Sequence, residues 1–339
     1  MDPVNESANA GTTDAAAEQG RAVQEAGPER VSGQQPVVTD RLTKYYGGSR
    51  VVNGLNLTIE EGSVYALLGR NGAGKSTTIK MLMGLVHPDF GSATVLGEDA
   101  HNMTPETRAQ ISWVGEGHPL YRWMTIDGAI RFAKPFYPVW HDDLVEQVIE
   151  HFKLPRKRRL YRLSNGQRAQ VSLALAVASD PKLLILDDPT IGLDTVVRRD
   201  FLESMIQIIQ QEGRTILFSS HILSDVDRVA DHIGIMLDGV LRVDAPTERF
   251  RDALRKVVVE LPAPLPKPPD CPGLTSWAQT GNRLELVFVD FNEIHQSYVD
   301  SLTPTTQDVL ELNLEDAFVE YTRGARGIMP SFVREVAHV

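Results

Sequence analysis

The sequence predicts an α/β protein with one large domain followed by a smaller one. Three observations support this prediction. Short apolar runs of strand length alternate with helical segments between Val37 and residue 250. A glycine-rich loop at 69–77 joins one of these apolar runs to a helical segment. Beyond residue 250, strand and helix signals resume around a proline-rich stretch at 261–273.

The composition fits a globular protein and limits its partners. The 339 residues, 42 % of them hydrophobic, suffice for one domain of roughly 200–250 residues and a smaller one. A net charge of −11 argues against free nucleic acid as a partner. Cys271 is the single cysteine, so no internal disulfide is expected. No apolar run approaches the roughly 18 residues of a membrane span and no signal-peptide pattern is present, so we expect a cytoplasmic protein.

The first half of the large domain should be rich in strands. Alternating apolar residues predict strands within 37–59, and the apolar run at 63–68 predicts a buried strand. The next helical segment should end before Pro88, because the residue ahead of a proline disfavours helix. Apolar spacing and glycine turns then place a helix at 78–85 and strands at 93–96 and 111–114.

Residues 117–168 have a different character and are predicted to form a helical subdomain. Strand signals give way to prolines and aromatic side chains, among them Trp123, Phe132, Phe136 and Trp140. Helical spacing of apolar residues indicates helices at 127–133 and 142–152.

The remaining elements follow the same two periodicities. In the large domain we expect helices at 168–178, 196–211 and 224–230, strands at 183–186 and 215–219, and a hairpin of 233–237 with 240–243 around Asp238-Gly239. In the smaller domain we expect strands at 256–260 and 283–289 and helices at 293–301 and 314–322.

The domain boundaries follow from these elements. Residues 1–36 nearly lack large apolar side chains, so they are predicted to be a disordered tail. The large domain should span 37–250 and the small α/β accessory domain 251–325, with a second tail at 326–339.

The loop GRNGAGKST at 69–77 fits the phosphate-binding pattern G-x-x-x-x-G-K-[ST]. Its backbone N–H groups and the start of the following helix would wrap a polyphosphate. Lys75 can reach the outer phosphates, and the hydroxyl of Ser76 can bind Mg²⁺. A dinucleotide fold is excluded, because Thr77 stands where that motif needs glycine. The candidate nucleotide contacts are Gly69, Asn71, Gly72, Ala73, Gly74, Lys75, Ser76 and Thr77.

Three further positions carry candidate chemistry. Asp187 ends the apolar strand LLILD, where a carboxylate can face Ser76 across a Mg²⁺ site. LSNGQ at 163–167 opens a helix and offers a hydroxyl and backbone amides to an anion. His221 directly follows the strand TILFSS, where a polar side chain can point into a site at the sheet edge.

The order of these motifs resembles that of the nucleotide-binding subunit of ATP-binding-cassette (ABC) transporters. GRNGAGKS resembles the Walker A motif, LSNGQ the signature motif and LLILDDP the Walker B motif. The sequence IGLD, which ends at Asp194, resembles the D-loop, and Ser220-His221 resembles the switch histidine. Tyr46 matches the aromatic residue that stacks on adenine. The resemblance covers about 37–250, and the C-terminal segment more loosely resembles the accessory domain of the drug- and antibiotic-export branch.

The resemblance implies a P-loop NTPase core with an antiparallel β subdomain and a helical subdomain. It implies ATP and Mg²⁺ as ligands and a head-to-tail dimer that closes over ATP. A separate integral membrane permease would dock on the helical subdomain, which places the chain on the inner face of the cell membrane. The looser C-terminal resemblance implies export as the direction of transport. The roles it carries over are catalysis by Lys75, Asp188 and His221, Mg²⁺ binding by Ser76, Asp187 and Glu116, and nucleotide contacts from Tyr46, Ser164, Asn165, Gly166, Gln167 and Asp194.

Two positions depart from the family pattern. Asp188 stands where the family usually has glutamate, so the carboxylate is one methylene shorter. Glu116 stands where glutamine is usual and adds negative charge beside the phosphates. A displacement of about 1 Å can lower a rate by roughly 100-fold, so both substitutions are expected to retune turnover. A soluble ABC ATPase acting on ribosomes, DNA or protein complexes and a slow-turnover nucleotide sensor remain alternatives.

Three local questions stay open at this stage. Tyr45 competes with Tyr46 as the stacking residue. Asn165 replaces the commoner glycine of the signature motif, and asparagine would suit a left-handed backbone there. The basic run PRKRR at 155–159 faces anionic lipid, a partner or only solvent.

Overall fold

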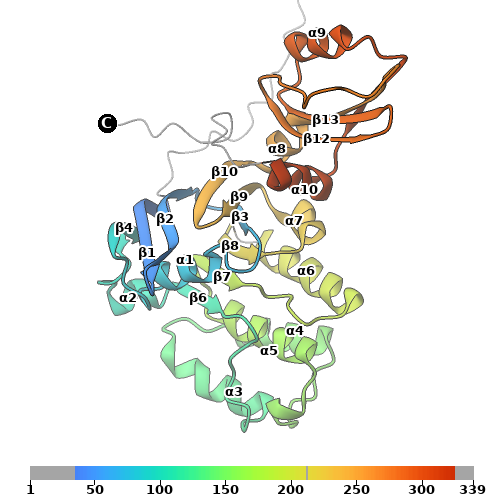
Figure 1. The fold of residues 1–339 in the computed structure, drawn as a ribbon. Coiled ribbons are helices and arrows are strands. Elements are labelled where there is room, and N and C mark those ends of the chain that lie inside the picture. Colours follow the sequence, from blue (N-terminus) through green and yellow to red (C-terminus); the bar gives the residue numbers. More distant parts are fainter. Residues whose placement is uncertain (1–34, 211–212, 325–339) are drawn as a thin grey trace, which may run out of the picture. The chain divides into compact units, whose positions relative to one another are not determined.

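The computed structural model describes residues 35–210 and 213–324, with no side-chain account of 204–210 and 324 (Figure 1). The two predicted tails, 1–36 and 326–339, therefore lie outside the described residues, apart from residues 35 and 36. Among the described residues, no helix combines the length and the apolar character needed to cross a bilayer.

A six-stranded sheet organises the large domain, in the strand order β10-β9-β3-β8-β7-β6. All neighbours in it are parallel except β10, which pairs antiparallel with β9. The strands are β3 (Val64–Leu68), β6 (Ile111–Val114), β7 (Leu183–Asp187), β8 (Thr215–Ser220), β9 (His232–Leu237) and β10 (Val240–Pro246). The mixed order confirms the predicted α/β class.

Both faces of this sheet are buried, which explains why its strands read as unbroken apolar runs. On β7, Leu184 and Leu186 belong to one core cluster, whereas Leu183 and Ile185 belong to the cluster on the other face. Successive side chains of a strand point to opposite faces, so each run supplies both cores.

The second core cluster joins the large sheet to a four-stranded sheet of order β2-β1-β4-β5, in which neighbouring strands are antiparallel. Its strands are β1 (Val37–Tyr46), β2 (Ser49–Ile59), β4 (Phe90–Val95) and β5 (Glu98–Asp99). The helix α1 (Lys75–Leu82) contributes Ile79, Met81 and Leu82 to the same cluster. The short helix α2 (Pro105–Arg108) is capped by Thr104.

The helical subdomain has a separate apolar core built on α3 (Ile126–Ala133) and α4 (Asp142–His151). Thr125 caps α3 through a hydrogen bond from the Gly128 N–H. Two 3₁₀ turns accompany these helices, at Lys134–Phe136 and Leu160–Arg162. The long helix α5 (Asn165–Ala178) supplies residues to this core and to the core of the large sheet, so it ties the two together.

The elements after β7 cover the sheet and lead to the accessory domain. The helices are α6 (Thr195–Gln210), α7 (Leu223–Val229) and α8 (Thr247–Ala253). The accessory sheet has the order β12-β13-β11-β14, and its strands are β11 (Leu254–Glu260), β12 (Leu274–Thr280), β13 (Arg283–Val289) and β14 (Thr306–Glu311). The helices α9 (Glu293–Ser301) and α10 (Leu314–Gly324) complete it.

The accessory domain has its own core but shares its last helix with the large domain. Val257, Leu286 and Phe288 lie in the accessory core. In contrast, Ala317 and Tyr321 of α10 belong to the core cluster of the large sheet. The helix that ends the accessory domain therefore also covers the core of the large domain.

Several sequence-based expectations need correction. The helix expected at 78–85 begins and ends three residues earlier, because Gly74 caps it and Gly84 has a positive φ beyond its end. Asn165 is the first residue of α5 and lacks a positive φ, so the left-handed backbone that asparagine would tolerate does not occur there. The strands β12 and β14 and the helix α8 were not expected at all.

Candidate active site

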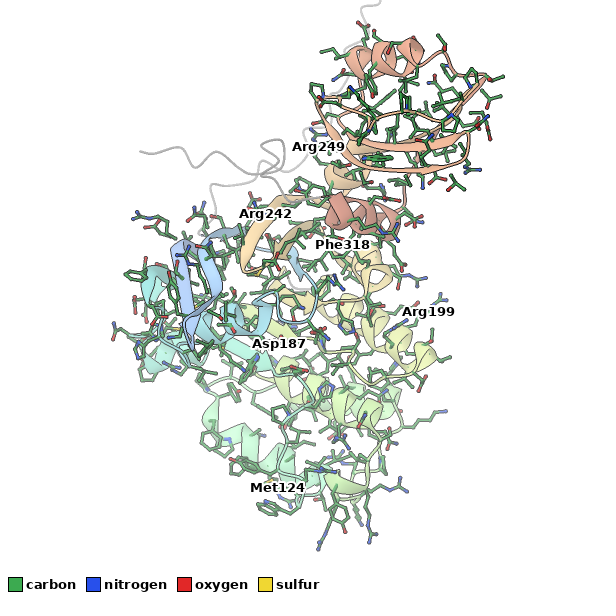
Figure 2. All side chains as sticks on the ribbon, viewed as in Figure 1. Met124, Asp187, Arg199, Arg242, Arg249 and Phe318 are labelled. Atoms are coloured by element: carbon green, nitrogen blue, oxygen red, sulfur yellow. The ribbon has the colours of Figure 1, made fainter. Side chains whose placement is uncertain are left out.

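The carboxyl edge of the large sheet collects most of the predicted catalytic residues. Because β3, β8, β7 and β6 are parallel neighbours, the loops that follow them leave from one edge. Ser220 pairs in register with the last residue of β3, and Ser219 pairs with Asp187. Figure 2 marks Asp187, where β7 ends.

The phosphate-loop motif forms a tight turn between β3 and α1. Gly74 has a φ of 104°, and a Cβ at this residue would lie 2.5 Å from the carbonyl oxygen of Val51, so only glycine fits. The buried Lys75 side chain donates from Nζ to the carbonyl oxygen of Gly69 at 2.8 Å, across the loop. The other predicted contacts in this segment are Asn71, Gly72 and Ala73 of the loop and Thr77 in the first turn of α1.

One carboxylate oxygen joins α1 to the sheet edge. The Ser76 hydroxyl donates to Asp187 Oδ1 at 3.1 Å, and the Ser219 hydroxyl donates to the same oxygen at 2.8 Å. Asp187 is only 1 % exposed. Hydroxyl and carboxylate oxygens are ligands that Mg²⁺ prefers, so Ser76 and Asp187 fit a Mg²⁺ ion beside a phosphate.

The second aspartate forms a pair with the predicted switch histidine. Asp188 Oδ1 lies 2.8 Å from Nδ1 of His221. An ionised carboxylate only accepts hydrogen bonds, so Nδ1 carries the proton in this pair. Asp188 also has a φ of 45°, and its N–H donates to the Ser219 hydroxyl oxygen at 2.9 Å. The backbone therefore turns sharply between the two aspartates, which sends the two carboxylates to different partners.

Ser219 is a site residue that the sequence reasoning missed. Its single hydroxyl accepts from the Asp188 N–H and donates to Asp187, so it sets the geometry of both acidic residues. The signal was present in the sequence, since Ser219 directly precedes the predicted switch pair Ser220-His221.

The signature segment makes its hydrogen bonds locally. Ser164 and Gln167 form a reciprocal capping box at the start of α5. The side chain of Asn165 accepts from the guanidinium of Arg168. At Gly166, a Cβ would lie 2.6 Å from Cγ1 of Val197, so the absence of a side chain lets α5 approach α6.

The predicted D-loop residue Asp194 also has a structural role at this contact. Its Oδ1 accepts from the N–H groups of Val196 at 3.2 Å and Val197 at 3.0 Å, which caps the start of α6. The signature segment and the D-loop are therefore neighbours within one chain.

The two tyrosines at the end of β1 differ in their surroundings. Tyr45 accepts a hydrogen bond from Nε of Arg50 at 2.9 Å and meets Phe90 edge-on. Tyr46 is 49 % exposed, and only Lys44 lies over its ring, 5.6 Å from the centroid. The free ring face of Tyr46 favours it over Tyr45 as a stacking residue.

Glu116 is exposed and forms no hydrogen bond or ion pair with any residue in the described part of the chain. Its role at a Mg²⁺ ion beside Ser76 and Asp187 stays a prediction. Two residues later, His118 is buried, and burial together with the nearby Arg168 charge lowers its pKa to about 4. Sequence reasoning missed this neutral histidine, which lies between the loop after β6 and α5.

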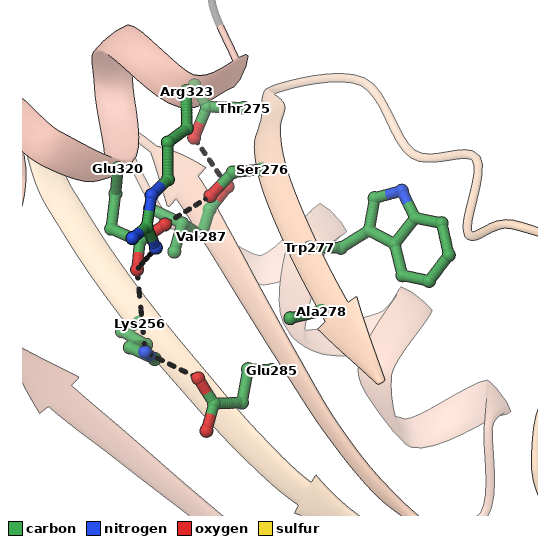
Figure 3. Close-up of a pocket in the computed structure, with 9 residues that line it drawn as sticks. All are labelled: Lys256, Thr275, Ser276, Trp277, Ala278, Glu285, Val287, Glu320 and Arg323. Carbon is green, nitrogen blue, oxygen red and sulfur yellow. Dashed lines mark hydrogen bonds and ion pairs between the residues drawn. The ribbon is translucent and has the colours of Figure 1, made fainter. Parts of the chain in front are cut away.

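A second cluster of charges lies in the accessory domain, around a pocket of about 410 Å³ (Figure 3). Lys256 Nζ lies 2.5 Å from Glu285 and 3.5 Å from Glu320, and the Ser276 hydroxyl donates to Glu320 at 2.8 Å. The acidic and basic groups satisfy one another. This pocket has neither a glycine-rich loop nor the start of a helix directed at it, so it is not a second phosphate site.

Fold and site together define a P-loop nucleoside triphosphatase. The family model described as "ABC transporter" matches residues 52–191. A bacitracin transport ATP-binding protein, BcrA of Bacillus licheniformis, is 32 % identical over 65 % of this chain and 72 % of its own length. The chain therefore belongs to the family of ABC transporter ATP-binding proteins, which are ATPases that bind ATP.

Other relatives extend the match. The ABC transporter ATP-binding protein YtrB of Bacillus subtilis is 26 % identical over 84 % of this chain and 98 % of its own length. The daunorubicin/doxorubicin resistance ATP-binding protein DrrA of Streptomyces peucetius is 32 % identical over 66 % of this chain and 69 % of its own.

Solved structures show the same fold. An ATP-binding subunit of an ABC transporter superposes with a TM-score of 0.58 at 27 % identity, covering 64 % of this chain and 92 % of that one. A dimeric ATP-binding cassette in a post-hydrolysis state with ADP and Pi superposes with a TM-score of 0.56 at 20 % identity, covering 62 % and 98 %. At that identity, the second likeness concerns the fold alone.

Proposed function

We propose that this chain hydrolyses MgATP within a dimer and thereby drives transport through a separate membrane-spanning subunit. The observation that carries the proposal is the pair of contacts at one sheet edge: Ser76 with Asp187, and Asp188 with His221. The first pair can hold a metal-bound phosphate, and the second pair can orient the attacking water. The groups that bind the phosphate and those that act on the water therefore lie at the ends of adjacent strands.

The chemistry follows from these residues. Lys75 and the loop amides offset the charge of the outer phosphates, and Mg²⁺ held by Ser76 and Asp187 would polarise them further. Asp188 orients the attacking water and accepts its proton while the water oxygen bonds to the γ-phosphorus. The bond from that phosphorus to the bridging oxygen breaks, and ADP leaves. Asp188 fixes the His221 ring, which positions the γ-phosphate and the water.

A second copy would complete the site. Ser164 to Gly166 start a buried helix whose N-terminal end attracts anions, and Asp194 lies beside it. In the proposed head-to-tail dimer this surface covers the γ-phosphate held by the phosphate loop of the partner. Tyr46 stacks on the adenine ring.

The membrane-spanning partner is proposed to dock beside the loop after β6. A groove of about 290 Å³ opens between this loop and the helical subdomain, and Trp113, Leu120, Tyr137 and Leu175 are among the residues that line it. The names of BcrA and DrrA, a transport and a resistance protein, support export as the direction. This attachment would place the chain at the inner face of the membrane.

Steady-state ATPase measurements and an Asp188→Asn variant test the chemistry. The variant should bind ATP and dimerise on it, as seen by size-exclusion chromatography, but lose hydrolysis by about 100-fold or more, because it cannot accept a proton. Hydrolysis at the unchanged rate would contradict the proposed role of Asp188.

The transport proposal needs a different experiment. The tagged chain should be recovered from detergent-solubilised membranes together with a membrane-spanning protein. Recovery only with ribosomes or DNA would overturn it in favour of a soluble ABC ATPase.

The short side chain of Asp188 and the negative charge of Glu116 favour one alternative, a slow-turnover ATP-dependent regulator. Single-turnover measurements distinguish the two functions. In the presence of its permease, a transporter ATPase should convert its bound ATP to ADP and phosphate rapidly, whereas a regulator should remain ATP-bound.

A further inference from the structure

An exposed surface on the helical subdomain combines cations with aromatic rings. We call it the basic–aromatic surface, and it consists of Arg122, Trp123, Lys157, Arg158, Arg159 and Tyr161. All six side chains are exposed; Trp123 is 67 % and Tyr161 43 % exposed. Large aromatic side chains seldom remain this open in a monomer unless a partner covers them.

Backbone hydrogen bonds bring the two halves of this surface together. The Tyr161 N–H donates to the Arg122 carbonyl at 2.9 Å, and the Leu160 N–H donates to the Met124 carbonyl at 2.8 Å. Met124, labelled in Figure 2, and Leu160 are buried in the subdomain core. Trp123, in the turn before Met124, and Tyr161, in the 3₁₀ turn that begins at Leu160, are both exposed, so these two backbone bonds join an exposed aromatic side chain from each segment.

The cations of the surface are free to bind an external anion. Arg122, Lys157, Arg158 and Arg159 form no ion pair with another residue in the described part of the chain. Arg156 differs from them, because it pairs with Asp127 at 2.7 Å and with Glu146. That pairing anchors the basic segment to the subdomain while leaving four positive charges uncompensated in a chain whose net charge is −11.

We propose that the basic–aromatic surface binds anionic phospholipid headgroups at the membrane surface. Arginine and lysine side chains are attracted to anionic lipids, and tryptophan and tyrosine rings favour the headgroup region. The combination fits a bilayer better than a soluble acidic peptide, which would use the cations but not the outward rings. The proposal goes beyond the proposed function, in which the permease alone holds the chain at the membrane.

Vesicles that contain no permease provide the test. The purified full chain is sedimented with phosphatidylcholine vesicles with and without phosphatidylglycerol. We expect binding only to the anionic vesicles and weaker binding at higher salt. Arg158→Glu/Arg159→Glu should lower the partition coefficient by about tenfold or more, since each removed cation alone lowers it roughly fivefold. Arg41→Glu/Arg108→Glu changes the net charge equally outside the surface and should bind like wild type.

Tryptophan emission gives a second readout. Binding to anionic vesicles should shift the emission to the blue, and Trp123→Phe should remove that shift, whereas Trp277→Phe in the accessory domain should retain it. Equal ATPase rates and melting temperatures of all variants establish that they are folded.

Several outcomes would overturn the proposal. These are absence of vesicle binding by wild type, equal binding to neutral and anionic vesicles, and unchanged binding by Arg158→Glu/Arg159→Glu. Loss of permease recovery by that variant, with no vesicle binding by wild type, would assign the surface to the permease. ATP hydrolysis is measured without vesicles, so it succeeds or fails independently.

Discussion

One hydroxyl group holds both acidic residues of the candidate site. Ser219 donates to the carboxylate of Asp187 and accepts from the backbone N–H of Asp188, so it links the first carboxylate to the backbone of the second aspartate. Asp188 in turn holds His221. One carboxylate oxygen of the shorter aspartate is therefore held by the imidazole of His221. The other oxygen is left for water.

Replacing Asp188 by the longer glutamate should change the rate of ATP hydrolysis. We expect Asp188→Glu to raise the steady-state ATPase rate, by about tenfold or more, because the added methylene moves the carboxylate about 1 Å toward the water. The rate is measured with saturating MgATP. The variant Asp200→Glu, an equal change on the exposed face of α6, should leave the rate unaltered. An unchanged rate for Asp188→Glu would show that the surrounding loop already compensates for the short side chain.

At the scale of elements, α5 and α6 approach closely because Gly166 lacks a side chain. Gly166→Ala would place its Cβ 2.6 Å from Cγ1 of Val197. We expect a loss of about 1–3 kcal/mol in the free energy of unfolding, measured by urea denaturation. Adding Val197→Ala should restore most of the loss by removing the clashing methyl group. Equal stabilities of the single and double variants would contradict this packing.

The charge cluster of the accessory sheet makes a pH-dependent contribution to the stability of the fold. The bond to Lys256 lowers the pKa of Glu285, while burial lowers the pKa of Lys256 less than its acidic partners raise it. A depressed carboxyl pKa stabilises the fold above its unfolded value near 4.5, and this stabilisation is lost as the pH falls through the folded pKa. Because the pKa of Lys256 is raised, the lysine stabilises the fold below pH 10.5. This stabilisation is lost as the pH rises through the pKa of the folded state.

Lys256→Met should therefore destabilise the fold by about 1 kcal/mol or less at neutral pH, because the pair is partly solvated. The difference from wild type should shrink in denaturation experiments at about pH 3, where Glu285 is protonated. Arg249→Met, which removes a more exposed pair with Asp290, serves as the control. A stability difference that does not change with pH would refute this assignment.

Elements with continuous or periodic apolar residues could be predicted from the sequence, and elements with mostly polar residues could not. β6, β13 and α9 were predicted with their observed bounds, because continuous or periodic apolar residues mark them. β14 has polar and exposed residues throughout most of its length, so its sequence does not mark it as a strand. It forms a strand because it pairs with β11. The Asp188–His221 contact likewise depends on β7 and β8 becoming neighbours, which spacing along the chain does not reveal.

At the scale of the whole described unit, α10 links the accessory domain to the ATPase core. Tyr321 is fully buried, its ring meets Phe250 edge-on at 5.7 Å, and burial raises its pKa to about 12. Leu314 and Ala317 lie in the same cluster as residues of the large sheet. Leu254 of β11 and Val287 and Val289 of β13 lie in this cluster too, so α10 and one side of the accessory sheet pack together on the ATPase core.

Truncating the Tyr321 side chain should destabilise the large domain. Tyr321→Ala should cost about 3–5 kcal/mol in unfolding free energy. Hydrogen–deuterium exchange should rise in α7 and α8, which contact α10. Val299→Ala, in the separate accessory core, should instead raise exchange in β11 and β13. Exchange confined to the accessory domain in both variants would show that α10 does not support the ATPase core.

The position of α10 also affects the order in which the chain can fold during synthesis. The Tyr321 hydroxyl donates to the Arg242 carbonyl, 79 residues earlier in the chain. At about 5–20 residues per second, the ribosome needs roughly 4–16 s to cover that interval. For this time the nascent ATPase core presents an apolar face that its final helix will later cover. The large domain can therefore complete its core only after the accessory domain has been synthesised.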